Sequence, residues 1–420
     1  MCSIILMMDN SRLYIKIESL GEKMNNLLSE YINIYNEMKE NNNICIPLCA
    51  AETYISKFVK QPLISDFEGK YYFFEGNKIS ELKDLISSAC KELFDAKYTN
   101  SDSLTGINCF TVCAMSLLHS GDKVILTTPE QGGHASMPII LDTLNVSYDS
   151  VPYDFNKYQI NYSELNKMCS TNKYSFIIFC QSDLINVPDL NKIKLPDNMG
   201  IIYDATQTLG LIGGKCLSNP LECKNTILLG GTHKTLPSAA CGLIMTNNKI
   251  YSKQIDSKVT PDYLRDIQPN HMASLLLALI EQIEYGKKYQ HTIITLANKL
   301  GKYLENYNFN VAKIDAKTYS NTHQLFILMT KDEADSFYIT AQKYNISLNQ
   351  KHKKLFADDG IRIGTQQIAR FNWNDDDIAL LAELFYLIKK DNNSNRINEI
   401  RNQLITKKIP HFTFDEIIIK

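Results

Sequence analysis

The sequence lacks several features that would point to particular classes of protein. It carries almost no net charge, because 44 Lys and Arg residues balance 46 Asp and Glu residues to give −2. This balance gives no electrostatic reason to expect nucleic acid or an anionic membrane as a partner. The eleven cysteines form no C-x-x-C pair, and their odd number argues against a disulfide framework or a zinc site. We therefore expect no metal.

Targeting and membrane signals are also lacking. The apolar patch near the N-terminus is about six residues long, whereas a membrane helix needs roughly 20, and no positive charge precedes it as in a signal peptide. Many cysteines lie inside apolar runs such as SFIIFC, which is typical of small core residues in a reducing compartment. We expect a cytoplasmic protein that acts on a small molecule.

What the chain does have is a long alternation of helical and strand patterns. Short apolar runs, rich in β-branched residues, alternate with helical segments between about residue 78 and residue 246. Such runs predict a mostly parallel α/β sheet covered by helices on both faces. A long helical pattern (272–306) then leads to a smaller α+β region. We predict an N-terminal helical arm (1–55), a large domain (56–275) and a small C-terminal domain (276–420).

Four polar features follow or precede these apolar runs. Thr105 and Gly106 begin a helix, where free N–H groups favour an anion such as phosphate, although a plain helix cap is the commoner explanation. His134 follows two glycines after one strand, and Asp204 ends another strand. Lys234 lies after a third strand in an apolar setting, which lowers the pKa of an amine and suits a Schiff-base nucleophile. Together they form the set of residues that binds pyridoxal 5'-phosphate.

With these residues in view, the chain resembles serine hydroxymethyltransferase, within the aspartate aminotransferase superfamily (fold type I of pyridoxal-phosphate enzymes). The resemblance runs from about Met24 to the C-terminus. It rests on THKTL (232–236), GGH (132–134), KELF (91–94) and GIRIGT (360–365). The fold it implies is a mostly parallel seven-stranded sheet with flanking helices plus the smaller domain, and it implies a homodimer with shared active sites.

The resemblance also implies roles for the residues that bind the cofactor. Lys234 matches the lysine that holds the cofactor covalently, with His233 before it, and Asp204 matches the carboxylate that pairs with the pyridine nitrogen. His134 matches the histidine that stacks on the ring. The other cofactor contacts that the resemblance implies are Ser182 near the phenolic oxygen, Thr105, Gly106 and Ile107 in the phosphate loop, Gln207 and Thr232.

Substrate and proton-transfer roles come from three further segments. Arg362 in GIRIGT matches the arginine that grips the substrate carboxylate with its bidentate fork. Glu68 is the best match for the acidic residue that handles the proton of the reacting hydroxyl, with Glu75 as the alternative. Tyr72 keeps the family's aromatic hydroxyl for the substrate, whereas Phe73 has lost it.

The departures from the family pattern bear on the reaction. Gln207 stands where the family has a histidine, and Ala240 and Cys241 stand where it has an arginine and a glycine. The loop before GIRIGT reads NQKHKKLFADD (349–359). It lacks the Asn-Asp-Pro motif that, in the family, helps to hold the folate pterin. RDIQPNHM (265–272) replaces a glycine-rich phosphate loop from the partner subunit.

We therefore expect a pyridoxal-phosphate enzyme that cleaves or forms the Cα–Cβ bond of a small amino acid, as an aldolase or transaldolase without folate, in a specialised pathway. Three alternatives stay open at this stage. The first is a folate-dependent serine hydroxymethyltransferase, and the second is an aminotransferase or Cα-substitution enzyme on the same fold. The third is a non-catalytic dimeric scaffold.

Overall fold

The structure is a computed structural model that describes residues 5–9, 12–16, 22–69, 76–371, 373–390 and 393–419. Contacts divide the chain into two compact units, Met1–Ile46 and Pro47–Lys420. The first unit holds the antiparallel strands β1 (Ile5–Asp9) and β2 (Arg12–Lys16) and the helix α1 (Glu22–Ile44). The domain boundaries at 55/56 and 275/276 stay predictions.

A mostly parallel sheet forms the centre of the second unit, as the apolar runs predicted, and it has the seven strands that the resemblance implied. Every strand is parallel to its neighbours except β12, which runs antiparallel to both β11 and β4. The order across the sheet is β4 (Tyr98–Asn100), β12 (Pro237–Thr246), β11 (Thr226–His233), β10 (Gly200–Asp204), β9 (Phe176–Phe179), β5 (Lys123–Leu126) and β6 (Ser147–Ser150).

Helices cover both faces of this sheet, which explains why its strands are apolar on both sides. Ile177 of β9 packs into the core under one layer of helices, while its neighbour Ile178 packs under the other. The first layer contains α3 (Ile79–Phe94), α6 (Tyr162–Cys169), α7 (Leu209–Gly213) and the start of α9 (Pro269–Asn306). The second contains α4 (Gly106–Leu117), α5 (Ser136–Thr143) and α8 (Lys249–Lys258).

A smaller four-stranded antiparallel sheet follows along the chain. Its order is β13 (Asn310–Val311), β14 (Gln324–Leu328), β17 (Asp358–Gly364) and β16 (Asn349–Lys353). Its helices are α10 (Lys331–Lys343), α11 (Asp375–Lys390) and α12 (Ser394–Thr406). The segment 349–359 was expected to be a loop, and this expectation was wrong: five of its residues form β16, paired with β17.

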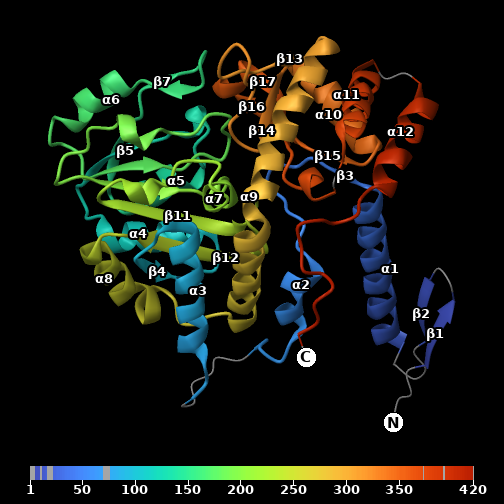
Figure 1. The fold of residues 1–420 in the computed structure, drawn as a ribbon, viewed down its shortest axis with the longest axis horizontal. Helices are drawn as coiled ribbons and strands as arrows, with labels where there is room; N and C mark the ends of the chain where they lie inside the picture. Colours follow the sequence, from blue (N-terminus) through green and yellow to red (C-terminus); the bar gives the residue numbers. More distant parts are fainter. Residues whose placement is uncertain are drawn as a thin grey trace. The chain divides into compact units, whose positions relative to one another are not determined.

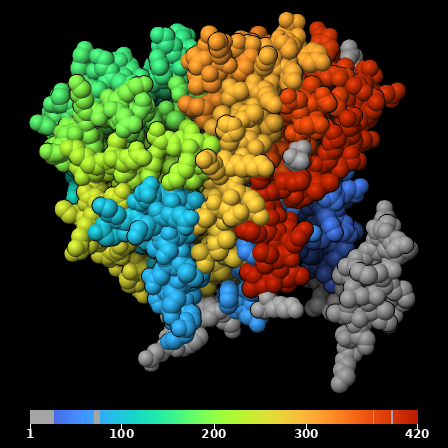
Figure 2. All heavy atoms as spheres, viewed as in Figure 1, coloured from blue at the N-terminus to red at the C-terminus, as the bar shows by residue number. Residues whose placement is uncertain are grey.

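The helix α9 links the two sheets. It is one continuous helix of 38 residues, and it contacts β12 of the large sheet and both β13 and β14 of the small one (Figure 1). In Figure 2 its side chains form a gold strip at the surface beside the C-terminal residues. The remaining short elements are β3 (Ile46–Pro47), α2 (Lys57–Lys60), β7 (Tyr153–Asp154), β8 (Gln159–Ile160) and β15 (Ile346–Ser347).

Candidate active site

A cavity of about 280 Å³ opens at the carboxyl ends of β5, β9, β10 and β11, where ligands gather in parallel sheets. It brings together nine of the residues predicted from the sequence, which are Thr105, Gly106, Ile107, His134, Ser182, Asp204, Gln207, His233 and Lys234. A wider surface hollow of about 790 Å³ lies beside Glu130 and Lys354 and contains none of the predicted residues. The smaller cavity is therefore the candidate active site.

The start of α4 forms one wall of the cavity. The Thr105 hydroxyl caps the helix by accepting the Asn108 N–H at 3.2 Å, and the N–H groups of the first turn have no acceptor within the helix. A Cβ atom at Gly106 would lie 2.5 Å from Thr206 Oγ1 and 2.8 Å from the Gly231 nitrogen. Only glycine allows the helix to start so close to the strand ends, and this start fits the phosphate of the cofactor.

Lys234 directly follows β11 and lines the cavity. Burial lowers the pKa of its amine to about 8, an effect that the neighbouring Asp204 carboxylate partly opposes. A sizeable fraction of the amine is therefore neutral near pH 8 and able to attack a carbonyl. The preceding residue, His233, is half-buried, and its Nδ1 has no partner among the described residues.

Asp204, at the end of β10, and His134, in the loop after β5, also line the cavity. Burial raises the pKa of Asp204, while the Thr206 N–H at 2.8 Å and the Lys234 amine stabilise its charged form. Burial also lowers the pKa of His134. Its Nδ1 accepts the Ser136 N–H at 3.2 Å, which leaves the proton of the neutral ring on Nε2. A carboxylate, a neutral aromatic ring and an amine around one cavity fit the ring of pyridoxal phosphate.

Gln207 and Ser182 are linked by Gln324, a residue of β14 that the sequence patterns did not reveal. The Gln324 amide donates to Gln207 Oε1 at 3.1 Å and to the Ser182 carbonyl at 3.0 Å. Because Gln324 is fully buried, this link fixes the two cavity residues against the small sheet. The titratable histidine of the family is thus replaced by a fixed amide.

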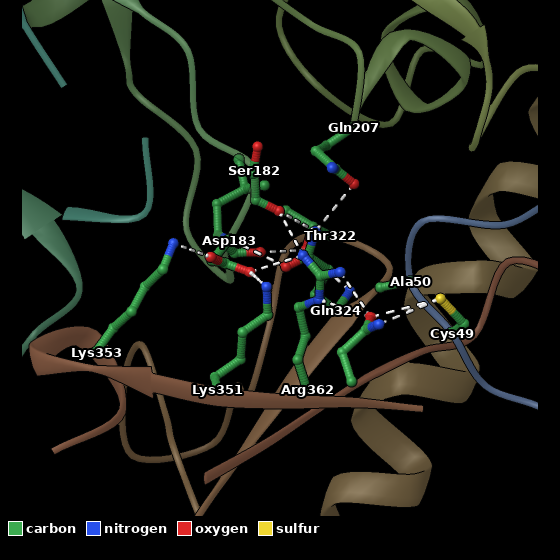
Figure 3. A network of polar contacts seen from close by, with 12 residues as sticks. Cys49, Ala50, Ser182, Asp183, Gln207, Thr322, Gln324, Lys351, Lys353 and Arg362 are labelled. Atoms are coloured by element: carbon green, nitrogen blue, oxygen red, sulfur yellow. Dashed lines mark hydrogen bonds and ion pairs between the residues drawn. The ribbon is translucent and has the colours of Figure 1, made fainter. Parts of the chain in front are cut away.

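Arg362 is almost completely buried at 4 % exposure, and its guanidinium is already engaged. Nη1 donates to Asp183 Oδ1 at 2.6 Å and to the Ser182 carbonyl at 2.9 Å, while Nε and Nη2 both donate to Asn349 Oδ1 (Figure 3). Four of its five N–H bonds therefore have acceptors. A bidentate grip on a substrate carboxylate, as the sequence suggested, requires Arg362 to release one of these partners.

Besides Arg362, two further predicted residues of the described chain do not line the cavity. Thr232 is fully buried, and its hydroxyl donates to the carbonyls of Ala239 and Cys241 at 3.0 and 3.2 Å, so it joins β11 to β12 and makes no wall of the cofactor cavity. Glu68 is exposed and accepts a hydrogen bond from the Asn270 amide at the start of α9. Tyr72 and Glu75, together with Phe73, lie outside the described residues.

Ala240 and Cys241, which replace family residues, also lie outside the cavity wall. Ala240 is exposed, and its carbonyl accepts a hydrogen bond from His271 Nδ1 at 2.7 Å. Cys241 is buried with its thiol toward the carbonyls of Ser101 and Ser103, and burial raises the pKa of that thiol to about 12. These two replacements do not alter the cavity within one chain.

The described part of the chain shows neither a membrane-spanning helix nor a metal-binding cluster. None of its helices is both long enough and apolar enough to span a membrane. Within the same residues, no three His, Cys, Asp or Glu side chains are grouped so that they could hold a metal ion.

Comparison with known proteins gives concordant results. The sequence profile of serine hydroxymethyltransferase matches residues 24–385. A serine hydroxymethyltransferase of Thermoplasma volcanium is 28 % identical over 85 % of this chain and 89 % of its own length. That of Methanosphaera stadtmanae is 26 % identical over 94 % and 96 %. The crystal structure of L-threonine transaldolase from Pseudomonas fluorescens, in its internal aldimine state, superposes with a TM-score of 0.85 at 18 % identity, over 94 % of this chain and 95 % of that one.

Proposed function

Because the chain belongs to the serine hydroxymethyltransferase family and is therefore a pyridoxal-phosphate-dependent enzyme, we propose that it cleaves and forms the Cα–Cβ bond of β-hydroxy-amino acids without folate. The products of cleavage are glycine and an aldehyde. In the transaldolase form of the reaction, a second aldehyde takes the place of the first. The similarity to L-threonine transaldolase, at 18 % identity, supports the shared fold.

The observation that carries the proposal is the strand β16, which occupies the segment where the family holds folate. Its side chains Asn349, Lys351 and Lys353 are directed to Arg362 and Asp183, with Lys–carboxylate distances of 3.0 and 2.7 Å. They are therefore engaged in an ion-pair network, and they do not replace the family's Asn-Asp-Pro motif, which helps to hold a pterin. This difference favours release or exchange of the aldehyde over transfer to folate.

The residues of the cavity have distinct tasks in this reaction. Bound pyridoxal phosphate supplies an electron sink for the pair of electrons released when a bond to Cα breaks. Lys234 supplies the amine that holds the cofactor, and its lowered pKa eases exchange with the substrate amine. Asp204 would hold the proton on the ring nitrogen of the bound cofactor, and the start of α4 would hold its phosphate. The Arg362 guanidinium would bind the substrate carboxylate once it releases one of its present acceptors.

Among the described residues of one chain, Asp204 is the carboxylate that lines the cavity, and its proposed task is to pair with the ring nitrogen rather than to take the hydroxyl proton. Glu68 is exposed beside Asn270 rather than among the cavity residues. We assign the proton transfer to Glu68 of the partner subunit in a homodimer, following the resemblance to the family. In a dimer with closed two-fold symmetry, a Glu68 that reaches the partner's cavity does so equally in both subunits.

The test uses purified enzyme loaded with pyridoxal phosphate. L-threonine, L-allo-threonine and L-serine are supplied with and without an acceptor aldehyde, and the released aldehyde is measured with a coupled dehydrogenase. The proposal predicts aldehyde release from at least one substrate without tetrahydrofolate. Absence of aldehyde from all substrates, with and without an acceptor, would refute it.

Folate-dependent serine hydroxymethyltransferase is the second candidate, because the relatives in sequence carry that name. Tetrahydrofolate separates the two candidates. In the folate-dependent enzyme, glycine and tetrahydrofolate together produce a long-wavelength absorbance band that neither ligand produces alone. Our proposal predicts the same spectrum with and without tetrahydrofolate.

A further inference from the structure

A cluster of four charged side chains beside the cavity contains more positive than negative charge. The Asp183 carboxylate is fully buried and contacts Arg362 Nη1 at 2.6 Å, Lys351 Nζ at 3.0 Å and Lys353 Nζ at 2.7 Å (Figure 3). Three cations and one anion leave this cluster with a net charge of +2. Among the described residues, Asp183 is the acidic residue that forms ion pairs with all three cations.

The alternation of strand β16 aligns the two lysines. Side chains two residues apart point to the same face of a strand, and Asn349, Lys351 and Lys353 all contact the cluster. The residues between them contact other partners: Gln350 donates to Asp335, and His352 lies 2.6 Å from Asp359. The lysines therefore form a stripe on the face that looks toward Asp183.

The backbone of Asp183 is fixed beside the cavity. The N–H groups of Ser182 and Asp183 both donate to the Gly132 carbonyl, at 2.7 and 3.0 Å. A Cβ atom at Gly132 would lie 2.1 Å from the Asp183 carbonyl oxygen, so the two loops touch directly. Arg362 Nη1 donates to the carbonyl of Ser182, which lines the cavity, so the cluster borders the cavity at Ser182, while Lys353 lines the wider surface hollow.

Excess charge in a partly buried site is costly unless a counter-ion neutralises it. The side chains of Lys351 and Lys353 are only 20 % and 25 % exposed, and an ammonium group has three donors, so each amine can bond a second acceptor besides Asp183. The α-carboxylate of the amino-acid substrate neutralises one of the two excess charges. The second positive charge needs another anion.

We propose that Lys351 and Lys353 select an aldehyde that carries an acidic group, either a carboxylate or a phosphate. This inference rests on the proposed aldol chemistry and names its co-substrate class. In the exchange with L-threonine, the Cα–Cβ bond breaks and acetaldehyde leaves with its carbonyl oxygen. A new bond then forms between Cα and the carbonyl carbon of the acidic aldehyde, whose oxygen takes the proton that the threonine hydroxyl gave up.

The test compares matched acceptors on the holoenzyme with L-threonine as donor. The acceptors are 4-formylbenzoate, its phosphate counterpart 4-formylphenyl phosphate and the neutral methyl ester of 4-formylbenzoate. We expect kcat/KM to be at least about tenfold higher for one of the acidic aldehydes than for the ester, as a charged hydrogen bond implies. The better of the two acidic aldehydes identifies the acidic group.

Variants of the two lysines connect the preference to the cluster. In Lys351→Gln and Lys353→Gln, the preference falls about tenfold, and Lys351→Arg restores most of it because the charge returns. Lys354→Gln is the matched control, because Lys354 lies over the Phe155 ring at 4.5 Å rather than beside Asp183. The inference is overturned if kcat/KM is equal for the acidic and neutral acceptors, or if Lys354→Gln loses the preference to the same extent. In either case, turnover of the ester would leave the proposed function intact.

A binding measurement decides the inference even if no acceptor is turned over, in which case the proposed function fails. Calorimetry compares the unreactive alcohols 4-(hydroxymethyl)benzoate, 4-(hydroxymethyl)phenyl phosphate and the benzoate's methyl ester in the presence of glycine. Tighter binding of an anion, lost in Lys351→Gln and retained in Lys354→Gln, supports the acidic site. Equal binding of all three alcohols refutes it.

Discussion

Replacing Asp183 by asparagine removes the only carboxylate of the charged cluster and should destabilise the protein in a pH-dependent way. Burial by itself raises the pKa of Asp183, but Arg362, Lys351 and Lys353 outweigh it and lower this pKa from 3.8 to about 2. A difference of this size between the unfolded and the folded protein corresponds to about 2 kcal/mol of stability. Leaving Arg362 buried without its anion raises the expected loss toward about 3–5 kcal/mol.

The sign of the pH dependence follows from the direction of the shift. Because the folded protein binds the Asp183 proton more weakly than the unfolded chain, the stabilisation is fully present above the ordinary pKa of 3.8 and is lost as the pH falls toward about 2. Wild type and Asp183→Asn should therefore differ most at neutral pH, and their stabilities should converge in strong acid.

Urea unfolding, followed by circular dichroism across a pH series, measures this difference. Asp359→Asn is the matched control, since Asp359 pairs with a largely exposed His352, and an exposed pair contributes less than about 1 kcal/mol. The reasoning is refuted if Asp183→Asn loses no more stability than Asp359→Asn at neutral pH, or if its loss persists unchanged in acid.

Three further predictions concern the cavity. Gly106→Ala should weaken cofactor binding at least about tenfold, because the new Cβ would lie 2.5 Å from Thr206 Oγ1; an unchanged absorbance titration with pyridoxal phosphate would contradict this. The rate at which the apoenzyme captures pyridoxal phosphate through Lys234 should rise with pH around a midpoint of about 8, as the amine loses its proton, and a midpoint near the ordinary 10.5 would disprove the role of burial. Mixing Lys234→Ala with Glu68→Gln, each nearly inactive alone, should restore up to about a quarter of wild-type activity if each site of a two-fold dimer uses both subunits. No recovery in verified mixed dimers would place Glu68 outside the partner's site.

The fold could be predicted to a large extent because its sheet is buried on both faces. Continuous apolar runs such as 176–179 and 200–203 are confirmed as the adjacent strands β9 and β10. The residues after those strands, among them Asp204, therefore meet at one edge, and the cavity follows from that edge. Spacing along the chain was enough to find them because each lies at the end of its own strand.

The charged cluster could not be predicted in the same way. Asp183 and Arg362 are 179 residues apart, and their contact depends on how the small sheet packs beside the large one. The alternating N-x-K-x-K pattern of residues 349–353 was a usable signal for a strand with one polar face. The segment was instead interpreted as a loop from its place before GIRIGT in the family pattern, so Lys351 and Lys353 were missed.

We propose above that this family member breaks the Cα–Cβ bond of β-hydroxy-amino acids without folate. The most direct test of this proposal is the steady-state rate of aldehyde release from L-threonine, L-allo-threonine and L-serine, with and without an acceptor aldehyde and in the presence and absence of tetrahydrofolate. We predict aldehyde release from at least one of these substrates at a rate that tetrahydrofolate leaves unchanged. A reaction that proceeds only with tetrahydrofolate, converting serine to glycine, would contradict the account.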